Sequence, residues 1–162
     1  MTFVSQETLA FRGVSTRSIM TDVLTPAQRS YNMSRIRSAH TGPELRVRRV
    51  LHAKGLRYRL HGKGLPGKPD LVFAGARAVL FVHGCFWHMH RCKRGKSVPA
   101  TNKNFWAEKR RSNVERDKRN RATLKKDGWR VFEIWECQTR YEETMLARLD
   151  PLIGFLRYKT CL

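Results

Sequence analysis

The stretch FVHGCFWHMHRC at residues 81–92 contains three histidines and two cysteines. Thiolates and imidazoles are the ligands that zinc takes in proteins, and a structural zinc ion holds four of them in a tetrahedron. Cys85, His90 and Cys92 follow the spacing C-x4-H-x-C, which is compact enough for all three side chains to reach one ion. The stretch therefore predicts a Zn²⁺ site that needs one more ligand from elsewhere in the chain.

Two further cysteines could supply this fourth ligand. Cys137 follows the strand-like run WRVFEIWE, and neighbouring strands of one sheet can bring it close, whereas Cys161 near the end of the chain is the poorer candidate. A site closed by four protein ligands is structural, so this zinc is expected to stabilise the loop and to take no part in chemistry. The alternative is that the cysteines are reduced and buried, with the histidines on the surface.

Asp70 is a candidate ligand for a second kind of metal ion. It follows Pro69 and begins the strand-like run DLVF, so its carboxylate can bind a divalent cation at the edge of a sheet. In the next strand, Val79, Phe81 and His83 share one face because side chains alternate along a strand. His83 is therefore expected near Asp70 at one end of the sheet, although a Pro-Asp pair alone is also common in turns.

Asp117 lies in a long polar helix, on the face that also carries Val114, Arg121 and Leu124. A carboxylate that faces inward needs a partner, and a histidine is the obvious one. Such a pair raises the pKa of the imidazole and fixes its tautomer, which suits a general base or acid. The alternative is an ion pair between Asp117 and Arg121, which fits the same spacing.

Glu44 fits two roles. It follows Thr41 by three residues and could complete a capping box at the start of a helix. It also shares a stripe with Val47 and Leu51, which would turn it toward the sheet and Asp70. Spacing alone does not choose between these roles.

The charge balance favours a polyanionic partner. The chain has 33 Lys and Arg against 13 Asp and Glu, a formal net charge of +20. Self-repulsion of this size destabilises a small domain unless a polyanion relieves it, so nucleic acid is the first candidate. A surface that only keeps the protein soluble, or one that binds a membrane surface, is the alternative. No apolar run approaches the roughly 20 residues that span a bilayer.

With 162 residues, of which 41% are hydrophobic, the chain is expected to form one domain with one core. Residues 1–25 show no sustained periodicity and are expected to form a flexible tail before a single domain over residues 26–162. The N-terminus lacks the continuous apolar segment of a signal peptide. We therefore expect a cytoplasmic protein, in which clustered Cys and His indicate a metal site and not disulfides.

Hydrophobic periodicity predicts an α/β fold with a small mixed sheet flanked by helices. Helices are expected over residues 25–39, 41–55, 101–128 and 144–156, the second and third ending at Gly55 and Gly128 and the last interrupted or bent at Pro151. Strands are expected over residues 58–62, 68–75, 77–84 and 129–136.

Together these residues resemble the very short patch repair (Vsr) endonucleases, bacterial enzymes related to the PD-(D/E)XK restriction nucleases. The matching stretches follow the family order over roughly residues 27–140: RSYNMSRIRS, LPGKPDLVF, HGCFWHMHRC, VPATNKNFWAEK, NVERD and GWRVFEIWEC. The resemblance implies a restriction-endonuclease-like fold and a Mg²⁺-dependent, strand-specific endonuclease, associated with the bacterial nucleoid. Such enzymes nick DNA on the 5′ side of the thymine in a T:G mismatch, the product of 5-methylcytosine deamination.

The resemblance also assigns roles to residues of the active site. Asp70 is implied as the metal-binding carboxylate, with the backbone carbonyl of Val82, where the family commonly has Thr, as a further ligand. His88 is implied as the general base or its partner, oriented by Asp117. The site is completed by His83 and Glu44, and the implied zinc ligands are Cys85, His90, Cys92 and Cys137. The chain has Met89 and Arg91 where the family has further histidines, and neither change affects an implied ligand.

Four residues match family positions that insert into DNA. Phe86, Trp87 and Trp106 match aromatic residues that enter beside the mismatch from the major groove, and Met33 matches a residue that enters from the minor groove. From residue type alone, Phe86 and Trp87 can stack on or wedge between bases, or they can cap the core beneath the zinc. Phosphate contacts are expected from basic residues of the long helix, Lys103, Lys109, Arg110 and Arg111.

The expected partner is double-stranded DNA with a T:G mismatch, bound by a monomer. The resemblance suggests mismatch-repair proteins as further partners, although no residue indicates them. Two other functions remain open: a related nuclease that cuts without a mismatch, and a zinc-stabilised DNA-binding protein without catalysis. Asp70, His88 and Asp117 distinguish an enzyme from a binding protein, and the four inserting residues distinguish mismatch recognition from another target.

Overall fold

The computed structural model describes residues 25–35 and 39–160 of the chain. The tail predicted over residues 1–25 lies outside these ranges except for Thr25, and Cys161 lies outside them as well. Helix α1 (Pro26–Ser34) contains Met33, whose side chain is also outside the described part. Within the described ranges, the chain forms four α-helices and one sheet of four strands, which confirms the α/β class.

The sheet is mixed and has the strand order β1–β2–β3–β4. Its strands are β1 (Arg59–Leu60), β2 (Leu71–Phe73), β3 (Ala78–His83) and β4 (Arg130–Trp135). β2 pairs antiparallel with β1 and β3, whereas β4 pairs parallel with β3. The start of β2 and the ends of β3 and β4 therefore meet at one end of the sheet, where Asp70 and His83 lie.

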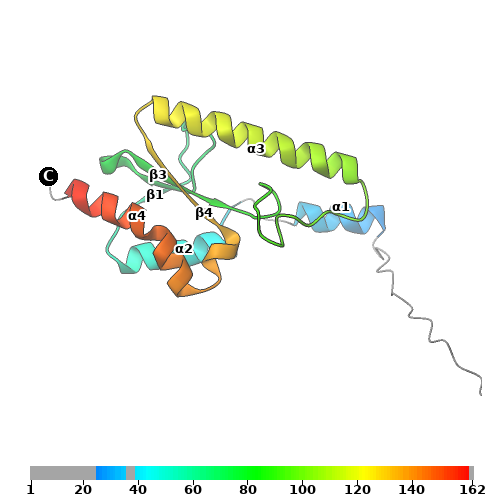
Figure 1. Cartoon of the computed structure of the whole chain (residues 1–162), viewed down its shortest axis with the longest axis horizontal. Helices are drawn as coiled ribbons and strands as arrows, with labels where there is room; N and C mark the ends of the chain where they lie inside the picture. Colours follow the sequence, from blue (N-terminus) through cyan, green and yellow to red (C-terminus); the bar gives the residue numbers. More distant parts are fainter. Residues whose placement is uncertain (1–24, 36–38, 161–162) are drawn as a thin grey trace, which may run out of the picture.

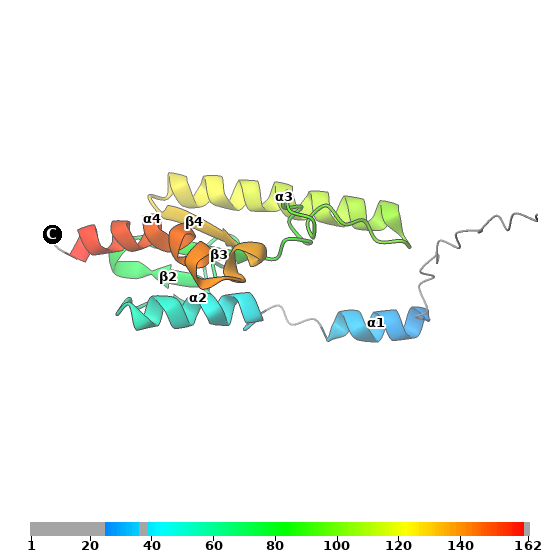
Figure 2. The same cartoon turned by 60° about the horizontal axis from the view of Figure 1, so that its bottom comes forward.

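Helices cover both faces of the sheet (Figures 1 and 2). They are α2 (Gly42–Ala53), α3 (Lys103–Lys126) and α4 (Glu142–Thr160). On one face, α2 and α4 pack against a core cluster that includes Leu80 of β3. On the other face, Leu124 of α3 packs against Val72, Val79 and Phe81. Because both faces of β3 are covered, this strand is an almost continuous apolar run.

Glycine ends α3 at the predicted place. Gly128 has a φ of +79°, a left-handed conformation that favours glycine because it has no Cβ. Its N–H donates to the carbonyl of Lys125, and the N–H of Trp129 donates to the carbonyl of Leu124. This pair of bonds is a Schellman motif, which stops the helix and turns the chain into β4. Gly55, with a φ of +76°, ends α2 in the same way.

The helix predicted to be interrupted or bent at Pro151 is not interrupted, since α4 runs unbroken from Glu142 to Thr160. A proline inside a helix removes one backbone hydrogen-bond donor and is unfavourable there. Leu149, Leu152 and Ile153 flank it on both sides and are buried in the core cluster. Their burial stabilises the helix across the proline.

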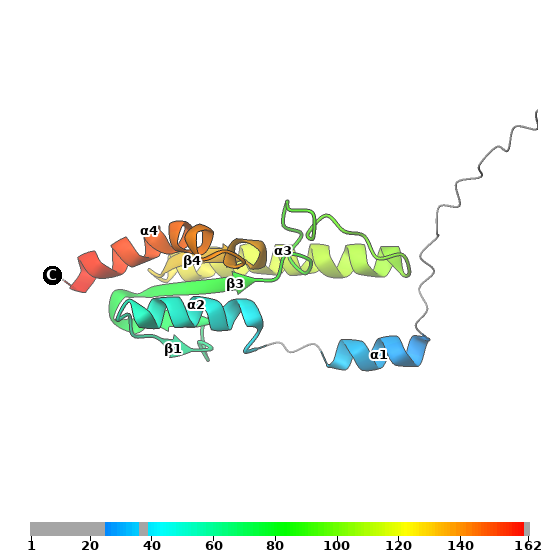
Figure 3. The ribbon, with the colours of Figure 1, turned by 90° about the horizontal axis from the view of Figure 1, so that it is seen from below.

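The end of the sheet where β3 stops is the part of the fold that positions the site. Beyond it lies the loop of residues 84–102, which connects β3 to α3. Helix α1 and the N-terminal half of α3 extend past the same end of the sheet (Figure 3). Residues from this loop, from α2 and α3 and from the ends of the strands come together there.

Candidate active site and metal centre

The four predicted zinc ligands come together where β3 and β4 end. One sulfur or nitrogen atom from each of Cys85, His90, Cys92 and Cys137 lies within 4.8 Å of the others. Cys137 Sγ is 3.5 Å from His90 Nδ1. A tetrahedral zinc ion with bonds of about 2.3 Å to sulfur and about 2.0 Å to nitrogen would separate these atoms by about 3.5 Å. The donor set and its spacing therefore fit Zn²⁺.

The surroundings of this group orient the His90 ring and favour the thiolate form of Cys92. Trp135 stacks on His90 with ring centroids 4.4 Å apart, and Glu136 accepts a 3.4 Å hydrogen bond from the backbone N–H of Cys85. Burial raises the pKa of the Cys85 thiol to about 12, whereas the hydrogen bond with His90 lowers the pKa of Cys92 to about 6. Metal binding requires thiolate, and Cys92 favours it at neutral pH.

Replacing Cys92 with serine is expected to lower the zinc content and the melting temperature of the protein, because a hydroxyl is a poor substitute for a thiolate ligand. Zinc per chain is measured by elemental analysis, and melting by circular dichroism. Cys161→Ser is the matched control and is expected to leave zinc content unchanged. An unchanged zinc-to-protein ratio in Cys92→Ser would rule out the ligand assignment.

Arg110 of α3 holds the loop of residues 84–102 and is only 5% exposed. Its guanidinium donates to the carbonyl oxygens of Phe86 at 2.7 Å, Ser97 at 2.9 Å and Gly95, and it lies 4.6 Å from the centroid of the Phe86 ring. The prediction that Arg110 binds a DNA phosphate is wrong, because these donors are used inside the protein. The residue instead fixes the backbone of the loop.

Phe86 and Trp87 of this loop form one aromatic cluster with Trp106 of α3. The ring centroids are 5.2 Å apart for Phe86 and Trp87 and 5.8 Å apart for Trp87 and Trp106, in edge-to-face contact. All three residues are partly exposed, and neither of the two core clusters includes them. Phe105 joins them against Trp106 and is 58% exposed. Phe105 was not predicted from the sequence, although it directly precedes Trp106.

Asp70 lies directly before β2 and is tied to β3. Its Oδ2 accepts a 2.7 Å hydrogen bond from the backbone N–H of Val82. Burial is the main cause that raises the pKa of Asp70; the Val82 N–H opposes the rise, and the charge of Glu44 adds to it. The carboxylates of Glu44 and Asp70 lie close together and away from bulk solvent, and a cation would reduce the repulsion between their charges. The residues therefore fit a divalent metal ion.

Glu44 faces the sheet and is 3% exposed. The capping box does not form, because the Thr41 hydroxyl donates to Glu44 Oε1 at 3.0 Å and makes no bond to the helix backbone. The backbone N–H of His40 and the guanidinium of Arg48 donate to Oε2 at 3.0 Å and 2.9 Å. Of the two roles that spacing left open, the structure therefore favours the one directed toward Asp70.

His61 joins this acidic group and was not predicted. One ligand atom from each of Glu44, His61 and Asp70 lies within 4.8 Å of the others. The backbone N–H of His61 donates to the carbonyl oxygen of Asp70 at 3.1 Å, which extends the pairing of β1 and β2 by one residue. The signal was present in the strand-like run YRLHG, which precedes the run that begins at Asp70.

The partner of Asp117 is His88, as the family resemblance implies. His88 Nδ1 is hydrogen-bonded to Asp117 Oδ2, and the side chains are 20% and 16% exposed. Burial acts to raise the pKa of Asp117, but the hydrogen bond and charge of His88 outweigh it and lower this pKa. Arg121, the alternative partner, donates instead to Glu133 at 2.6 Å.

His83 belongs to the same group as His88 and Asp117, since one ligand atom of each of the three lies within 4.8 Å of the others. Its ring centroid is 4.4 Å from that of His88. The expected place at the same end of the sheet as Asp70 is correct. Its hydrogen-bond partner, however, is Glu133 of β4, whose Oε1 lies 2.9 Å from His83 Nε2.

The histidines open into a pocket of about 520 Å³. Glu133 lies on its wall, and although burial acts to raise its pKa, His83 and Arg121 hold this pKa at about 2. Glu133 was not predicted from the sequence, because a single acidic residue in a strand does not by itself indicate a site. His83, His88 and Asp117 all line this pocket.

In the part that the structure describes, none of the helices has the length and apolar character of a membrane span.

Comparisons with known proteins match most of the chain. Residues 21–94 match the family model of the DNA mismatch endonuclease Vsr. The chain is 48% identical over 134 residues to the type II nicking enzyme V.XorIIP of Xanthomonas oryzae pv. oryzae (strain KACC10331 / KXO85), covering 83% of this chain and 98% of that protein.

Two further relatives show the same extent of likeness. The chain is 46% identical over 139 residues to the DNA mismatch endonuclease Vsr of Escherichia coli (strain K12), covering 83% of this chain and 88% of that protein. It is 42% identical over 134 residues to the type II nicking enzyme V.NmeAIP of Neisseria meningitidis serogroup A / serotype 4A (strain DSM 15465 / Z2491), covering 83% and 95%. These matches confirm the resemblance seen in the sequence, so the protein is a DNA endonuclease, and the chain belongs to the Vsr family of DNA mismatch endonucleases.

Proposed function

We propose that this endonuclease nicks one DNA strand on the 5′ side of the thymine in a T:G mismatch, the product of 5-methylcytosine deamination. The observation that carries this proposal is the placement of two chemically different groups at one end of the sheet. These are the Glu44–Asp70 carboxylates and the His88–Asp117 pair, with His83 beside the second of them. The names of the relatives, a mismatch endonuclease and nicking enzymes, support strand-specific cleavage at a mismatch.

Asp70 and the backbone carbonyl of Val82 would hold the catalytic Mg²⁺. When bound, Mg²⁺ polarises the scissile phosphate and stabilises the leaving oxygen. The chain prepares this site before binding, because the Val82 N–H orients the Asp70 carboxylate at 2.7 Å. Arg48 holds Glu44 in place beside it at 2.9 Å.

His88 acts as the general base in this proposal. Its Nδ1 is bound to Asp117, so Nε2 is the atom that accepts a proton from the attacking water. Asp117 fixes this tautomer and stabilises the imidazolium that forms. His83 is held by Glu133 and lies beside His88, with ring centroids 4.4 Å apart, so it is placed to contact the reacting phosphate.

The group of Cys85, His90, Cys92 and Cys137 would hold a structural Zn²⁺. His88 lies between two of these ligands in the chain, so a bound ion fixes the backbone on both sides of the proposed base. The same loop carries Phe86, and Arg110 binds it from α3. Zinc therefore serves catalysis by positioning, without contact to the substrate.

The aromatic cluster would recognise the mismatch by inserting between bases. Unstacking a base step costs a few kcal/mol and least where the pair is already weak, which favours a mismatch. Trp106 and Phe105 present partly exposed rings for this contact. Met33 is proposed to enter from the opposite groove on the basis of the family resemblance, and its side chain lies outside the part that the structure describes.

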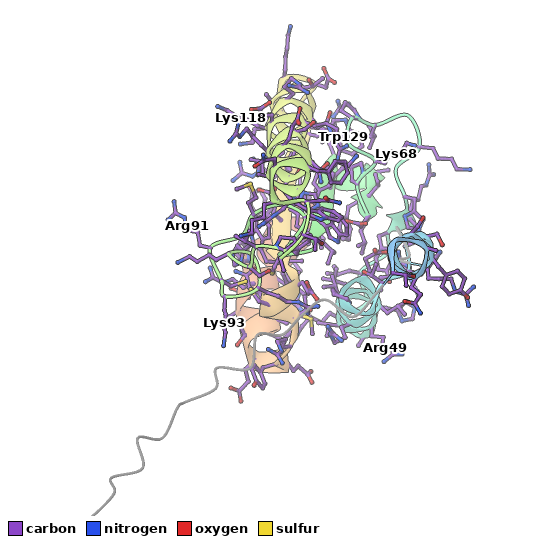
Figure 4. All side chains as sticks on the ribbon, turned by 90° about the vertical axis from the view of Figure 1, so that its right-hand side faces the viewer. Arg49, Lys68, Arg91, Lys93, Lys118 and Trp129 are labelled. Atoms are coloured by element: carbon purple, nitrogen blue, oxygen red, sulfur yellow. The ribbon has the colours of Figure 1, made fainter. Side chains whose placement is uncertain are left out.

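Exposed cations around this end of the sheet would bind the DNA backbone. Lys103, Lys109 and Arg111 are exposed on the N-terminal half of α3. Arg91 and Lys93 point away from the loop of residues 84–102 into solvent (Figure 4). Such contacts bind phosphates without reading sequence, and they weaken with salt.

Replacing Trp106 with alanine is expected to lower the preference for a T:G duplex over a paired duplex by about tenfold, because one aromatic contact to a base contributes about 1–3 kcal/mol. Binding to both duplexes is measured by fluorescence anisotropy without Mg²⁺. The control is Lys109→Ala, which should weaken binding to both duplexes equally and reduce the salt slope by about 1. An unchanged preference in Trp106→Ala would contradict the inserting role of this cluster.

A further inference from the structure

His61 lies where the two carboxylates of the acidic group meet. One of its imidazole nitrogens is within 4.8 Å of an oxygen of Glu44 and an oxygen of Asp70. Its backbone φ is +49°, a left-handed conformation that is uncommon for a residue with a side chain. The bond from its N–H to the Asp70 carbonyl maintains this conformation. Backbone strain of this kind is concentrated at functional sites.

The contacts around His61 leave a ring nitrogen able to act as a ligand. Arg48 Nη2 is 3.5 Å from His61 Nε2 but 2.9 Å from Glu44 Oε2, so the stronger bond of the guanidinium goes to Glu44. The ring of His40 meets that of His61 edge-on, with centroids 5.1 Å apart. These contacts orient the imidazole toward the carboxylates, and among residues 25–35 and 39–160 neither ring nitrogen has a hydrogen bond shorter than 3.5 Å.

Two carboxylates and an imidazole form a mixed oxygen and nitrogen ligand set. Mg²⁺ is a hard cation that takes oxygen ligands, whereas transition ions also accept imidazole nitrogen. We propose that His61 is a protein ligand of the catalytic cation and that it makes this centre bind Mn²⁺ more tightly than Mg²⁺. This inference rests on the proposed metal-assisted nicking and refines which ion serves it.

The test measures ion binding directly, on the full-length, zinc-loaded protein without DNA. Mn²⁺ affinity is obtained from the electron paramagnetic resonance signal of the free ion, and Mg²⁺ affinity from competition with Mn²⁺. Electron spin-echo modulation of bound Mn²⁺ then reports whether a nitrogen atom is in its coordination shell. The variant is His61→Asn, because asparagine tolerates the left-handed backbone that His61 adopts.

In the wild-type protein, we expect tighter binding of Mn²⁺ than of Mg²⁺ and nitrogen modulation of the bound Mn²⁺. In His61→Asn, Mn²⁺ affinity should fall by about tenfold or more, Mg²⁺ affinity should change by less than about threefold, and the nitrogen modulation should be lost. The matched control is His52→Asn, at an exposed histidine of the same region, which should leave all three quantities unchanged.

Nitrogen modulation that persists in His61→Asn, or its absence from the wild-type spectrum, would overturn the proposal even if the variant folds poorly. Nicking of a T:G duplex by the wild-type protein is measured in parallel with each ion. If nicking fails while the Mn²⁺ results hold, the proposed function is wrong and the metal ligand stands. If nicking occurs and the Mn²⁺ results fail, only the role of His61 is rejected.

Discussion

Asp70→Asn is expected to lower the rate of nicking by at least about 10³-fold while DNA affinity stays within about twofold. The variant removes the charge that would hold the catalytic cation, and metal assistance contributes several kcal/mol to such reactions. Asparagine keeps an oxygen that can accept the hydrogen bond from the Val82 N–H, so the start of β2 should stay attached to β3. Single-turnover nicking and DNA binding without metal measure the two quantities separately.

One result with Asp70→Asn would contradict the proposed metal-binding role. A folded variant that no longer binds DNA would show that Asp70 supports the DNA-binding surface and not the chemistry. Asp70→Ala should give the same loss of nicking, because both variants lack the carboxylate. The control is Asp150→Asn, at an exposed carboxylate of α4, which should nick at the wild-type rate.

His88→Ala is expected to lower the single-turnover rate by about 10²–10⁴-fold, the usual contribution of a general base. Asp117→Asn should cost less than His88→Ala, because it removes the group that orients the base and leaves the imidazole in place. Zinc content is measured on both variants, since His88 lies two residues from His90. A rate loss accompanied by zinc loss would assign the effect to the loop and not to proton transfer.

The double variant His88→Ala/Asp117→Asn separates a shared function from two independent ones. If Asp117 acts only through His88, the double variant should nick as fast as His88→Ala, because residues that act as one unit are not additive. Multiplied losses in the double variant would show that Asp117 has a role of its own in the site.

The group of Cys85, His90, Cys92 and Cys137 could be predicted from the sequence because it depends on residue type and short spacing. Three of its members lie within eight residues, and only the choice between Cys137 and Cys161 required an inference about strands. The helices and strands were also recognisable, since periodicity and the glycines that end α2 and α3 are local signals. The order and pairing of the strands were not predicted.

The residues that sequence reasoning missed depend on contacts between distant segments. Glu133 meets His83 only because β3 and β4 pair in a register that places Trp135 beside His83, which no local pattern reveals. His61 reaches Asp70 by one extra step of pairing after β1. The sequence predicts that Arg110 contacts a DNA phosphate, because a cation on a polar helix is usually exposed. Its burial requires carbonyl oxygens from a loop folded against α3.

The most direct test of the proposed function is nicking of strand-labelled duplexes, one with a central T:G mismatch and one fully paired, with and without Mg²⁺. The account predicts a metal-dependent nick on the 5′ side of the mismatched thymine, on that strand only, and none in the paired duplex or with Asp70→Ala. Equal cutting of both duplexes would contradict mismatch recognition and indicate a nuclease with another target. Tight binding without cutting, across several sequence contexts around the mismatch, would contradict the catalytic roles of Asp70 and His88.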